Sequence, residues 1–254
     1  MSRFLDRRLP PVDLHTHIAP DVTPAQLAQL APSVVFAVTR SLEEAALVRH
    51  RTDPGVIWGC GAHPGVASAL DGFDEDRFVR LLEHFAFVGE VGLDARGSLE
   101  RQRRVLDGIL AACSFTPVIV SLHSSGRAEE VVEMLEQHAI RGPVLHWFTG
   151  AADLVDRAAQ VGAFFSVNSS AKRDLLATLP PERVLTETDF PSTKRTGSLL
   201  PGDVNKVEEA LSALWGIEHE VVRRRIWRNL RDLVAASGTL DRLPTDMARK
   251  LIAA

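Results

Sequence analysis

Two histidines and an aspartate alternate along the first apolar segment of the chain, which reads Val12-Asp13-Leu14-His15-Thr16-His17. Residues two apart in an extended strand point to the same side, so Asp13, His15 and His17 are expected to share one face. Two imidazoles and a carboxylate on one side of a rigid segment form much of a metal site. The Asp-x-His-x-His pattern is short, and a site would need partners from elsewhere in the chain.

Further histidines and carboxylates stand at the ends of later apolar runs, where a strand would pass into a loop. They are His63, Glu90, Asp94, His123, His146 and Asp189. One strand-end histidine by itself is more often a hydrogen-bonded core or surface residue than a ligand. Five histidines at such positions, counting His15 and His17, together with Glu90 and Asp189, indicate a metal site.

This set of donors suits two divalent ions. Imidazole nitrogen fits Zn or Mn, and carboxylate oxygen fits Mg or Mn. A bridging Glu90 would hold the ions about 3.5–4 Å apart, as in two-metal hydrolases, which activate a water and polarise a phosphoryl oxygen. Asp189 is expected to take the proton of that water, which makes Glu90 and Asp189 the candidate catalytic residues. Asp13 is expected to orient a ligand from behind.

The elements that must position these residues alternate between apolar strands and amphipathic helices. Strands are predicted at 12–17, 33–38, 56–62, 86–92, 117–123, 142–146, 163–167 and 183–186. Helical spacing follows them, as in Phe78, Leu81, Leu82 and Phe85, which stand at i, i+3, i+4 and i+7. Eight alternations in 254 residues predict an α/β fold, a single (β/α)8 TIM barrel over residues 1–254 that is closed by C-terminal helices.

An open, doubly wound sheet is the alternative fold. The Gly-x-Gly-x-x-Gly fingerprint that this fold often carries is absent, because Gly59-Cys60-Gly61 lacks the third glycine in register. In a barrel, the C-terminal ends of the strands lie together at the face where active sites are built. The candidate ligands stand at those ends, which favours the barrel.

Composition excludes several classes of protein. The formal net charge of −4 argues against a protein that coats nucleic acid, although bound divalent ions would allow nucleic acid in a local pocket. Cys60 and Cys113 lack metal-type spacing and are expected in the core, because two cysteines make no disulfide framework. Met1–Asp6 lacks an apolar signal region and no stretch approaches a membrane span, which predicts a cytoplasmic protein without a membrane partner.

With these residues laid out, the sequence resembles the TatD-like metal-dependent deoxyribonucleases, barrel relatives of the amidohydrolases. The resemblance rests on motifs that run in order through nearly the whole chain: Val12–His17, Gly61–Pro64, Gly89–Asp94, Gln102, His123-Ser124, His146–Gly150, Glu187–Pro191 and Asn229. Together these motifs are specific, whereas Asp-x-His-x-His alone is not.

The resemblance implies a dinuclear site and a nuclease activity. One ion would be held by His15, His17, Glu90 and Asp189, and the other by Glu90, His123 and His146. His63 would lie near the substrate phosphate rather than act as a ligand. The implied activity is metal-dependent hydrolysis of DNA phosphodiesters, often from an end.

Several substrate-facing positions depart from the family pattern. Gly65 replaces the second histidine of His-Pro-His, Ser125 stands where arginine is common, Trp147 stands where cysteine is usual, and no tyrosine follows Asp94. The predicted metal ligands are all present, so hydrolysis is expected, and the identity of the substrate is left open. Two phrases, Ser121–Ser124 and Phe165–Ser170, resemble the TatD-related component of Qat-type anti-phage systems, which implies antiviral defence and defence-system protein partners.

Three further residues are candidates for substrate contact. Lys194 and Arg195 follow the last predicted strand and could bind phosphates, with a solvated loop as the alternative. Trp147 could stack on a splayed base, a contact worth about 1–3 kcal/mol, or pack beside its strand.

The sequence therefore predicts a divalent-metal-dependent deoxyribonuclease that acts on single strands or ends of DNA. Two alternatives stay open. One is an interaction subunit of a defence complex with little activity alone, and the other is a hydrolase of an ester, lactone or amide. The complete ligand set favours an enzyme over a subunit, and the nuclease motifs favour phosphodiesters.

Overall fold

A computed structural model describes residues 9–253, so the predictions for residues 1–6 lie outside the described part of the chain. All eight predicted strands form, and they pair in parallel in chain order. The strands are β1 (Val12–His17), β2 (Val34–Val38), β3 (Val56–Cys60), β4 (Phe87–Gly92), β5 (Ile119–His123), β6 (Pro143–His146), β7 (Phe164–Val167) and β8 (Val184–Thr186). Almost every strand residue is buried, as expected for parallel strands covered on both faces.

The last strand meets the first and completes the barrel. Asp189 N donates to His15 O at 2.9 Å, and His17 N donates to Phe190 O at 2.9 Å. Thr186 Oγ1 of β8 donates to Val12 O of β1 at 2.5 Å. The fold is therefore the predicted (β/α)8 barrel, and the doubly wound sheet is excluded.

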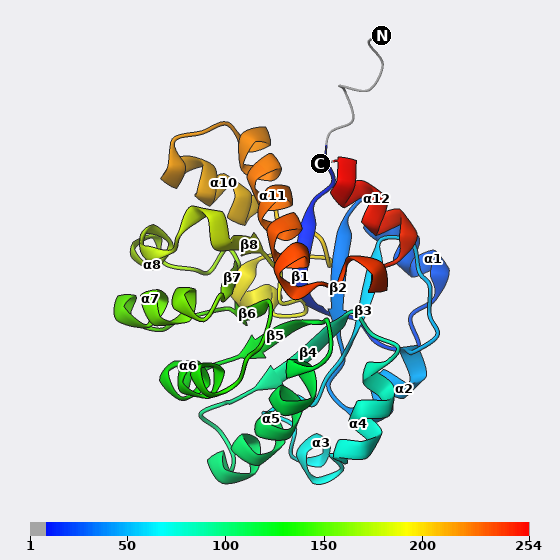
Figure 1. Ribbon diagram of the computed structural model, residues 1–254. Coiled ribbons are helices and arrows are strands. Elements are labelled where there is room, and N and C mark those ends of the chain that lie inside the picture. The colour runs from blue at the N-terminus through cyan, green and yellow to red at the C-terminus, as the bar shows by residue number, and fades with distance from the viewer. Residues whose placement is uncertain (1–8, 254) are drawn as a thin grey trace.

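Helices surround the strands on the outside of the barrel (Figure 1). They are α1 (Pro24–Leu27), α2 (Leu42–Val48), α3 (Ala67–Asp71), α4 (Glu75–Leu82), α5 (Leu99–Ser114), α6 (Ala128–Gln137), α7 (Ala152–Gln160), α8 (Arg173–Thr178), α9 (Thr193–Thr196), α10 (Asn205–Trp215), α11 (His219–Ser237) and α12 (Thr245–Ala253). Short 3-10 segments add η1 (Ala28–Leu30), η2 (Pro181–Arg183) and η3 (Leu240–Arg242). Beyond the two C-terminal helices that apolar spacing predicts, α12 buries Met247 and Leu251, four residues apart.

Two of the strands that carry candidate ligands are irregular. The register of β1 against β2 shifts between Asp13 and Thr16, and that of β4 against β5 shifts between Val88 and Val91. Bulges of this kind change the direction of a side chain and are common beside active sites. His15 and Glu90 lie inside these irregular stretches, so strict alternation does not describe β1.

The interior of the barrel and its contact with the helices form one apolar core. Cys60 and Cys113 are buried free thiols within it, as predicted. Within residues 9–253, no helix has the length and apolar character that a membrane crossing requires.

Candidate metal centre

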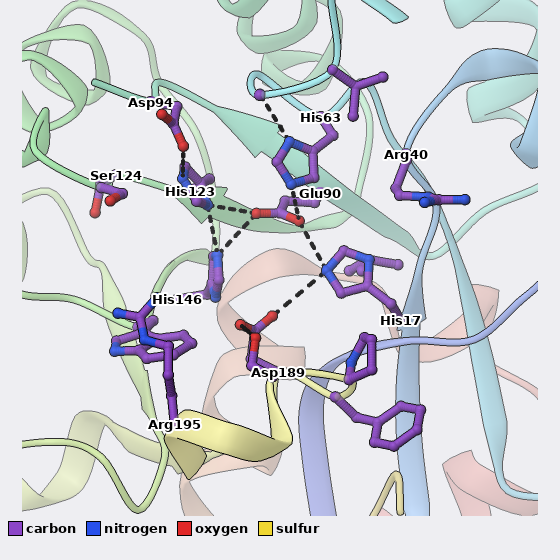
Figure 2. A pocket seen from close by; sticks show the side chains of 18 of the residues that line it. His17, Arg40, His63, Glu90, Asp94, His123, Ser124, His146, Asp189 and Arg195 are labelled. Carbon is purple, nitrogen blue, oxygen red and sulfur yellow. Dashed lines mark hydrogen bonds and ion pairs between the residues drawn. The ribbon is translucent and has the colours of Figure 1, made fainter. Parts of the chain in front are cut away.

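The predicted ligands converge at the C-terminal ends of the strands. Figure 2 shows His17, His63, Glu90, His123, His146 and Asp189 pointing toward one another from separate elements of the barrel. These side chains line a cavity of about 680 Å³, and His15 lies fully buried beside them. The structure therefore brings together all six predicted metal ligands and His63.

Glu90 stands between two groups of imidazole nitrogens. Its Oε1 lies 2.6 Å from His123 Nδ1 and 3.1 Å from His146 Nε2. Its Oε2 lies 3.2 Å from His17 Nε2 and 3.2 Å from His63 Nε2. A carboxylate with each oxygen facing a different set of nitrogens has the placement that a bridging ligand requires.

Asp189 faces the histidines of β1. Its Oδ1 lies 3.5 Å from His17 Nε2 and 3.7 Å from His15 Nε2, and its Oδ2 accepts a hydrogen bond from Ser192 Oγ at 2.9 Å. Donor atoms of His15, His17 and Asp189 all lie within 4.8 Å of one another, as do those of His15, Glu90 and His146. Both groups have the density of donors that a divalent ion requires.

Polar side chains face the outer nitrogens of three imidazoles, two of them within hydrogen-bond distance. His15 Nδ1 lies 2.8 Å from Ser121 Oγ, and His123 Nε2 lies 3.0 Å from Asp94 Oδ2. His146 Nδ1 faces Glu187 Oε2 at 3.6 Å. Partners of this type orient the ring of a ligating histidine and leave its other nitrogen directed at the metal.

The donor set fits a metal on two observations. Among residues 9–253, no hydrogen bond of good geometry reaches His15 Nε2 or Glu90 Oε2, although both atoms are buried. His123 Nδ1 and His146 Nε2 also face each other at 3.1 Å, where two lone pairs repel unless a proton or a cation lies between them. Buried polar atoms without a partner are costly, and divalent ions would satisfy these.

The electrostatics of the cavity favour positive charge at its centre. Burial alone would lower the pKa of His17, but the adjacent carboxylates of Asp189 and Glu90 outweigh it and raise that pKa to about 9. Burial would raise the pKa of Glu90, yet contacts with His123 and His146 hold it well below its usual range. Burial and the neighbouring His146 lower the pKa of His15 to about 3, so that ring is neutral, as a ligand must be.

His63 differs from the other histidines of the cavity in which ring nitrogen carries the proton. Its Nδ1 accepts a hydrogen bond from Gly65 N at 2.9 Å, so a neutral ring carries its proton on Nε2, the atom that faces the cavity. Burial lowers the pKa of His63 and favours this neutral form. A ring in this form donates a hydrogen bond into the cavity and does not offer a lone pair to a metal.

Asp13 lies next to the site and contacts the backbone of a predicted ligand rather than its side chain, because its Oδ1 accepts from His15 N at 3.4 Å. Its carboxylate accepts from Thr188 N at 2.9 Å, from Thr188 Oγ1 at 2.6 Å and from Gly202 N at 2.8 Å. It therefore positions Asp189 only through the adjacent residue. Burial raises the pKa of Asp13 to about 7.

The predicted substrate-contact residues are placed unevenly. Arg195 and Trp147 both line the cavity, and the Arg195 guanidinium lies 4.2 Å from the centre of the Trp147 ring. Lys194 is exposed on α9 and is not among the residues that line the cavity. Trp147 and Asp189 have φ values of 42° and 46°, a strained region that clusters at functional sites.

The sequence assigned no role to Glu187, although this buried carboxylate connects several parts of the site. Its Oε1 accepts from Trp147 N and from Asn168 Nδ2, each at 3.0 Å, and its Oε2 accepts from Ser166 Oγ. Sequence reasoning also passed over Ser121 and the contact of Asp94 with His123. The available signal was a polar residue inside an otherwise apolar strand, as at Ser121 and Ser166.

The sequence profile described as TatD related DNase matches residues 12–235. A relative from Escherichia coli K12, the uncharacterized metal-dependent hydrolase YjjV, is 30% identical over 165 residues, 59% of this chain. The chain spans 63% of that relative, just under two thirds of its length. The 3′-5′ ssDNA/RNA exonuclease TatD of Pantoea vagans is 29% identical over 209 residues, 71% of this chain and 78% of that protein.

The fold has a close counterpart among solved structures. The crystal structure of YjjV, a TatD homologue from Escherichia coli K12, superposes with a TM-score of 0.73 at 23% identity, over 87% of this chain and 97% of that one. The profile match covers all eight strands and every predicted ligand. The chain therefore belongs to the TatD related DNase family.

Proposed function

We propose that the protein hydrolyses phosphodiester bonds of nucleic acid with two divalent ions, Mg, Mn or Zn. The observation that carries this proposal is Glu90, whose two oxygens face separate groups of imidazoles. His15, His17, Glu90 and Asp189 would hold one ion, and Glu90, His123 and His146 the other. When bound, such ions lower the pKa of a water and stabilise charge on the phosphate.

Other side chains of the cavity transfer a proton, bind phosphate and orient the metal ligands. Asp189 takes the proton of the attacking water, and Ser192 Oγ keeps its carboxylate in place. His63 directs its Nε2 proton into the cavity and donates to a phosphate oxygen. Ser121, Asp94 and Glu187 hold the imidazoles in the orientation that leaves their inner nitrogens free.

The substrate enters past Trp147 and Arg195. Because Arg195 covers one face of the Trp147 ring, a base that stacks on this side uses the other face, while the guanidinium contacts phosphate. Lys194, exposed on the same helix, contacts the nucleic acid further from the cavity. The name of the Pantoea vagans relative, a 3′-5′ ssDNA/RNA exonuclease, supports a single-stranded end as the substrate, with DNA as the first choice.

The test is hydrolysis by the purified protein after its metal content has been measured. End-labelled single- and double-stranded DNA and RNA are incubated with Mn or Mg, and products are resolved by length. Asp189→Asn is expected to lower the rate by about 100-fold or more, because proton transfer in hydrolysis commonly contributes that much. Asp174→Asn, at an exposed position on α8, is the matched control and retains full activity.

The remaining outcomes would overturn this proposal in different ways. Full activity in Asp189→Asn would exclude that residue as the base. A metal-loaded protein that cleaves no nucleic acid but hydrolyses an ester, lactone or amide would be a hydrolase of that substrate class and not a nuclease. A metal-loaded protein without any hydrolytic activity would favour an interaction subunit within a defence complex.

A further inference from the structure

A second hollow, here called the side cleft, opens beside the metal centre between the start and the end of the barrel. Its volume is about 260 Å³, and its apolar walls are Ile18, Val22, Leu27, Leu30, Phe190 and Leu200. The residues of β1 and its following helix form one wall, and the loop after β8 forms the other. The proposed hydrolysis leaves this cleft unused.

The side cleft is continuous with the cavity that holds the ligands. His17, Ile18, Ala19 and Phe190 line both spaces. Phe190 directly follows Asp189, the proposed base, so the ring and the carboxylate are neighbours along the backbone. A group in the side cleft therefore lies next to whatever occupies the metal centre.

The chemistry of the walls selects a neutral occupant. Within residues 9–253, no Lys, Arg, Asp or Glu lines the side cleft, His17 is its only titratable residue, and Gln26 and Gln29 add amide groups beside the apolar walls. Phosphate therefore has no cationic partner there, whereas the metal cavity contains Arg40, Arg96 and Arg195. A volume of 260 Å³ corresponds to about nine waters of the liquid, which suits one planar ring system and is too small for a base pair.

Both walls are anchored to the strand that carries the ligands. Phe190 O accepts from His17 N at 2.9 Å, which fixes the backbone of the aromatic wall to β1. Gly202 N donates to Asp13 Oδ2 at 2.8 Å, two residues beyond Leu200. A preformed pocket of this kind costs little ordering when a ligand binds.

We propose that the side cleft holds a single unpaired nucleobase of the nucleotide whose phosphodiester lies at the metal centre. The base inserts beside Phe190 and Leu200, and its sugar spans the rim at His17. This inference rests on the proposed nuclease function and adds to it a reason for single-stranded ends, because only an unpaired base can enter. Asp13 then has a second role, since it holds the loop that carries Leu200.

The chain offers a matched pair of variants for the test. Leu200 lines the cleft and is 47% exposed, while its neighbour Leu199 is 74% exposed and lines neither cavity. Leu200→Ser and Leu199→Ser therefore make the same change one residue apart. Each is compared with the wild-type protein on single-stranded oligonucleotides that carry either a normal or an abasic nucleotide at the cleaved end.

The wild-type protein is expected to prefer the normal end by about tenfold or more in kcat/KM, because an aromatic contact with a base is worth this much. Leu200→Ser is expected to reduce that ratio to about twofold, and Leu199→Ser to leave it unchanged. Equal cleavage of both ends by the wild-type protein would overturn the inference while leaving the nuclease function intact. An equal reduction of the ratio in both variants would also overturn it.

A binding measurement keeps this inference separate from the proposed function. A 2-aminopurine mononucleotide, which contains no phosphodiester bond to cleave, is titrated into the metal-loaded protein, and its fluorescence reports burial of the base. Leu200→Ser is expected to weaken binding about fivefold or more relative to wild type and Leu199→Ser, because the base loses apolar contact with the leucine side chain. If this result holds and no oligonucleotide is cleaved, the nuclease function fails and the base site stands; affinity that depends on Trp147 but not on Leu200 would place the base elsewhere.

Discussion

At the scale of single residues, the site depends on which nitrogen of each imidazole faces inward. Ser121 and Asp94 hydrogen-bond the outer nitrogens of His15 and His123, Glu187 faces the outer nitrogen of His146 at 3.6 Å, and the inner nitrogens meet near Glu90. Glu187 is fully enclosed and also accepts a hydrogen bond from the backbone N–H of Trp147, whose φ is strained. It thus connects the orientation of His146 with the shape of the substrate entrance.

Glu187→Gln should therefore weaken metal binding without removing a ligand. The amide replaces an acceptor with a donor opposite His146 and Ser166, so the ring loses the partner that orients it. A loss of metal affinity of about 10–100-fold is expected, as for other residues behind metal ligands. Titration calorimetry with Mn measures it, and Glu182→Gln at an exposed position of η2 is the control. Unchanged metal affinity would mean that Glu187 fixes only the backbone of Trp147 at the substrate entrance.

At the scale of elements, the long helix α11 holds the barrel closed from outside. Asn229 Nδ2 donates to Pro181 O at 2.8 Å and to Val184 O at 2.7 Å, which fixes the start of β8. Trp227 Nε1 donates to Pro10 O at 2.8 Å and fixes the segment before β1. One helix therefore positions the two strands whose other ends carry His15, His17 and Asp189.

Asn229→Ala is expected to destabilise the fold by about 1–3 kcal/mol, because the carbonyls of Pro181 and buried Val184 lose their donor. Denaturation with urea, followed by circular dichroism, measures the change in the free energy of unfolding. Asn205→Ala, at an exposed position of α10, should change it little. Activity per folded molecule should be retained, and a selective loss of activity would show that α11 also shapes the site.

The two thiols are enclosed by packing between elements. Cys60 lies on β3 and Cys113 on α5, and both are almost completely buried. Burial raises the pKa of the Cys60 thiol to about 12 and also raises that of Cys113. The thiolate is the reactive form, so neither residue should react with Ellman's reagent at pH 8 in the native protein. Both should react in guanidinium, and rapid labelling of the native chain would contradict this packing.

At the scale of the whole molecule, the centre gathers mutually repelling groups from both ends of the chain. The carboxylates of Glu90 and Asp189 both face His17 Nε2, and the imidazoles of buried His146 and partly buried His123 face each other beside Glu90. Such a centre lowers the stability of the fold unless cations compensate it. Metal binding and folding are consequently coupled.

Removal of metal should lower the melting temperature. A divalent ion at 100 times its dissociation constant stabilises the native state by about 2.7 kcal/mol, which corresponds to roughly 5–10 °C for a chain of this size. Calorimetry with and without EDTA measures the shift. Glu90→Gln should abolish most of it, because this variant loses the carboxylate charge that faces both groups of imidazoles. Equal melting temperatures with and without metal would indicate that no ion binds the folded state.

The sequence by itself determined the barrel and predicted which residues meet at the C-terminal ends of its strands. Apolar runs alternating with helical spacing require parallel strands covered by helices, and chain order then places every strand end at one face. Residues as distant as His15 and Asp189 could therefore be assigned to one centre without any measured distance. Each of the eight predicted strands is present, with ends that differ from the predicted ones by at most two residues.

The tertiary structure alone decided the contacts behind and beside that centre. The register shifts at His15 and Glu90, the partners of Asp13, and the enclosure of Glu187 depend on the packing of loops and bulges. The side cleft joins Leu27 to Leu200, which no local pattern relates. Periodicity reports only which face of an element is buried, whereas these features depend on how loops from distant parts of the chain pack together.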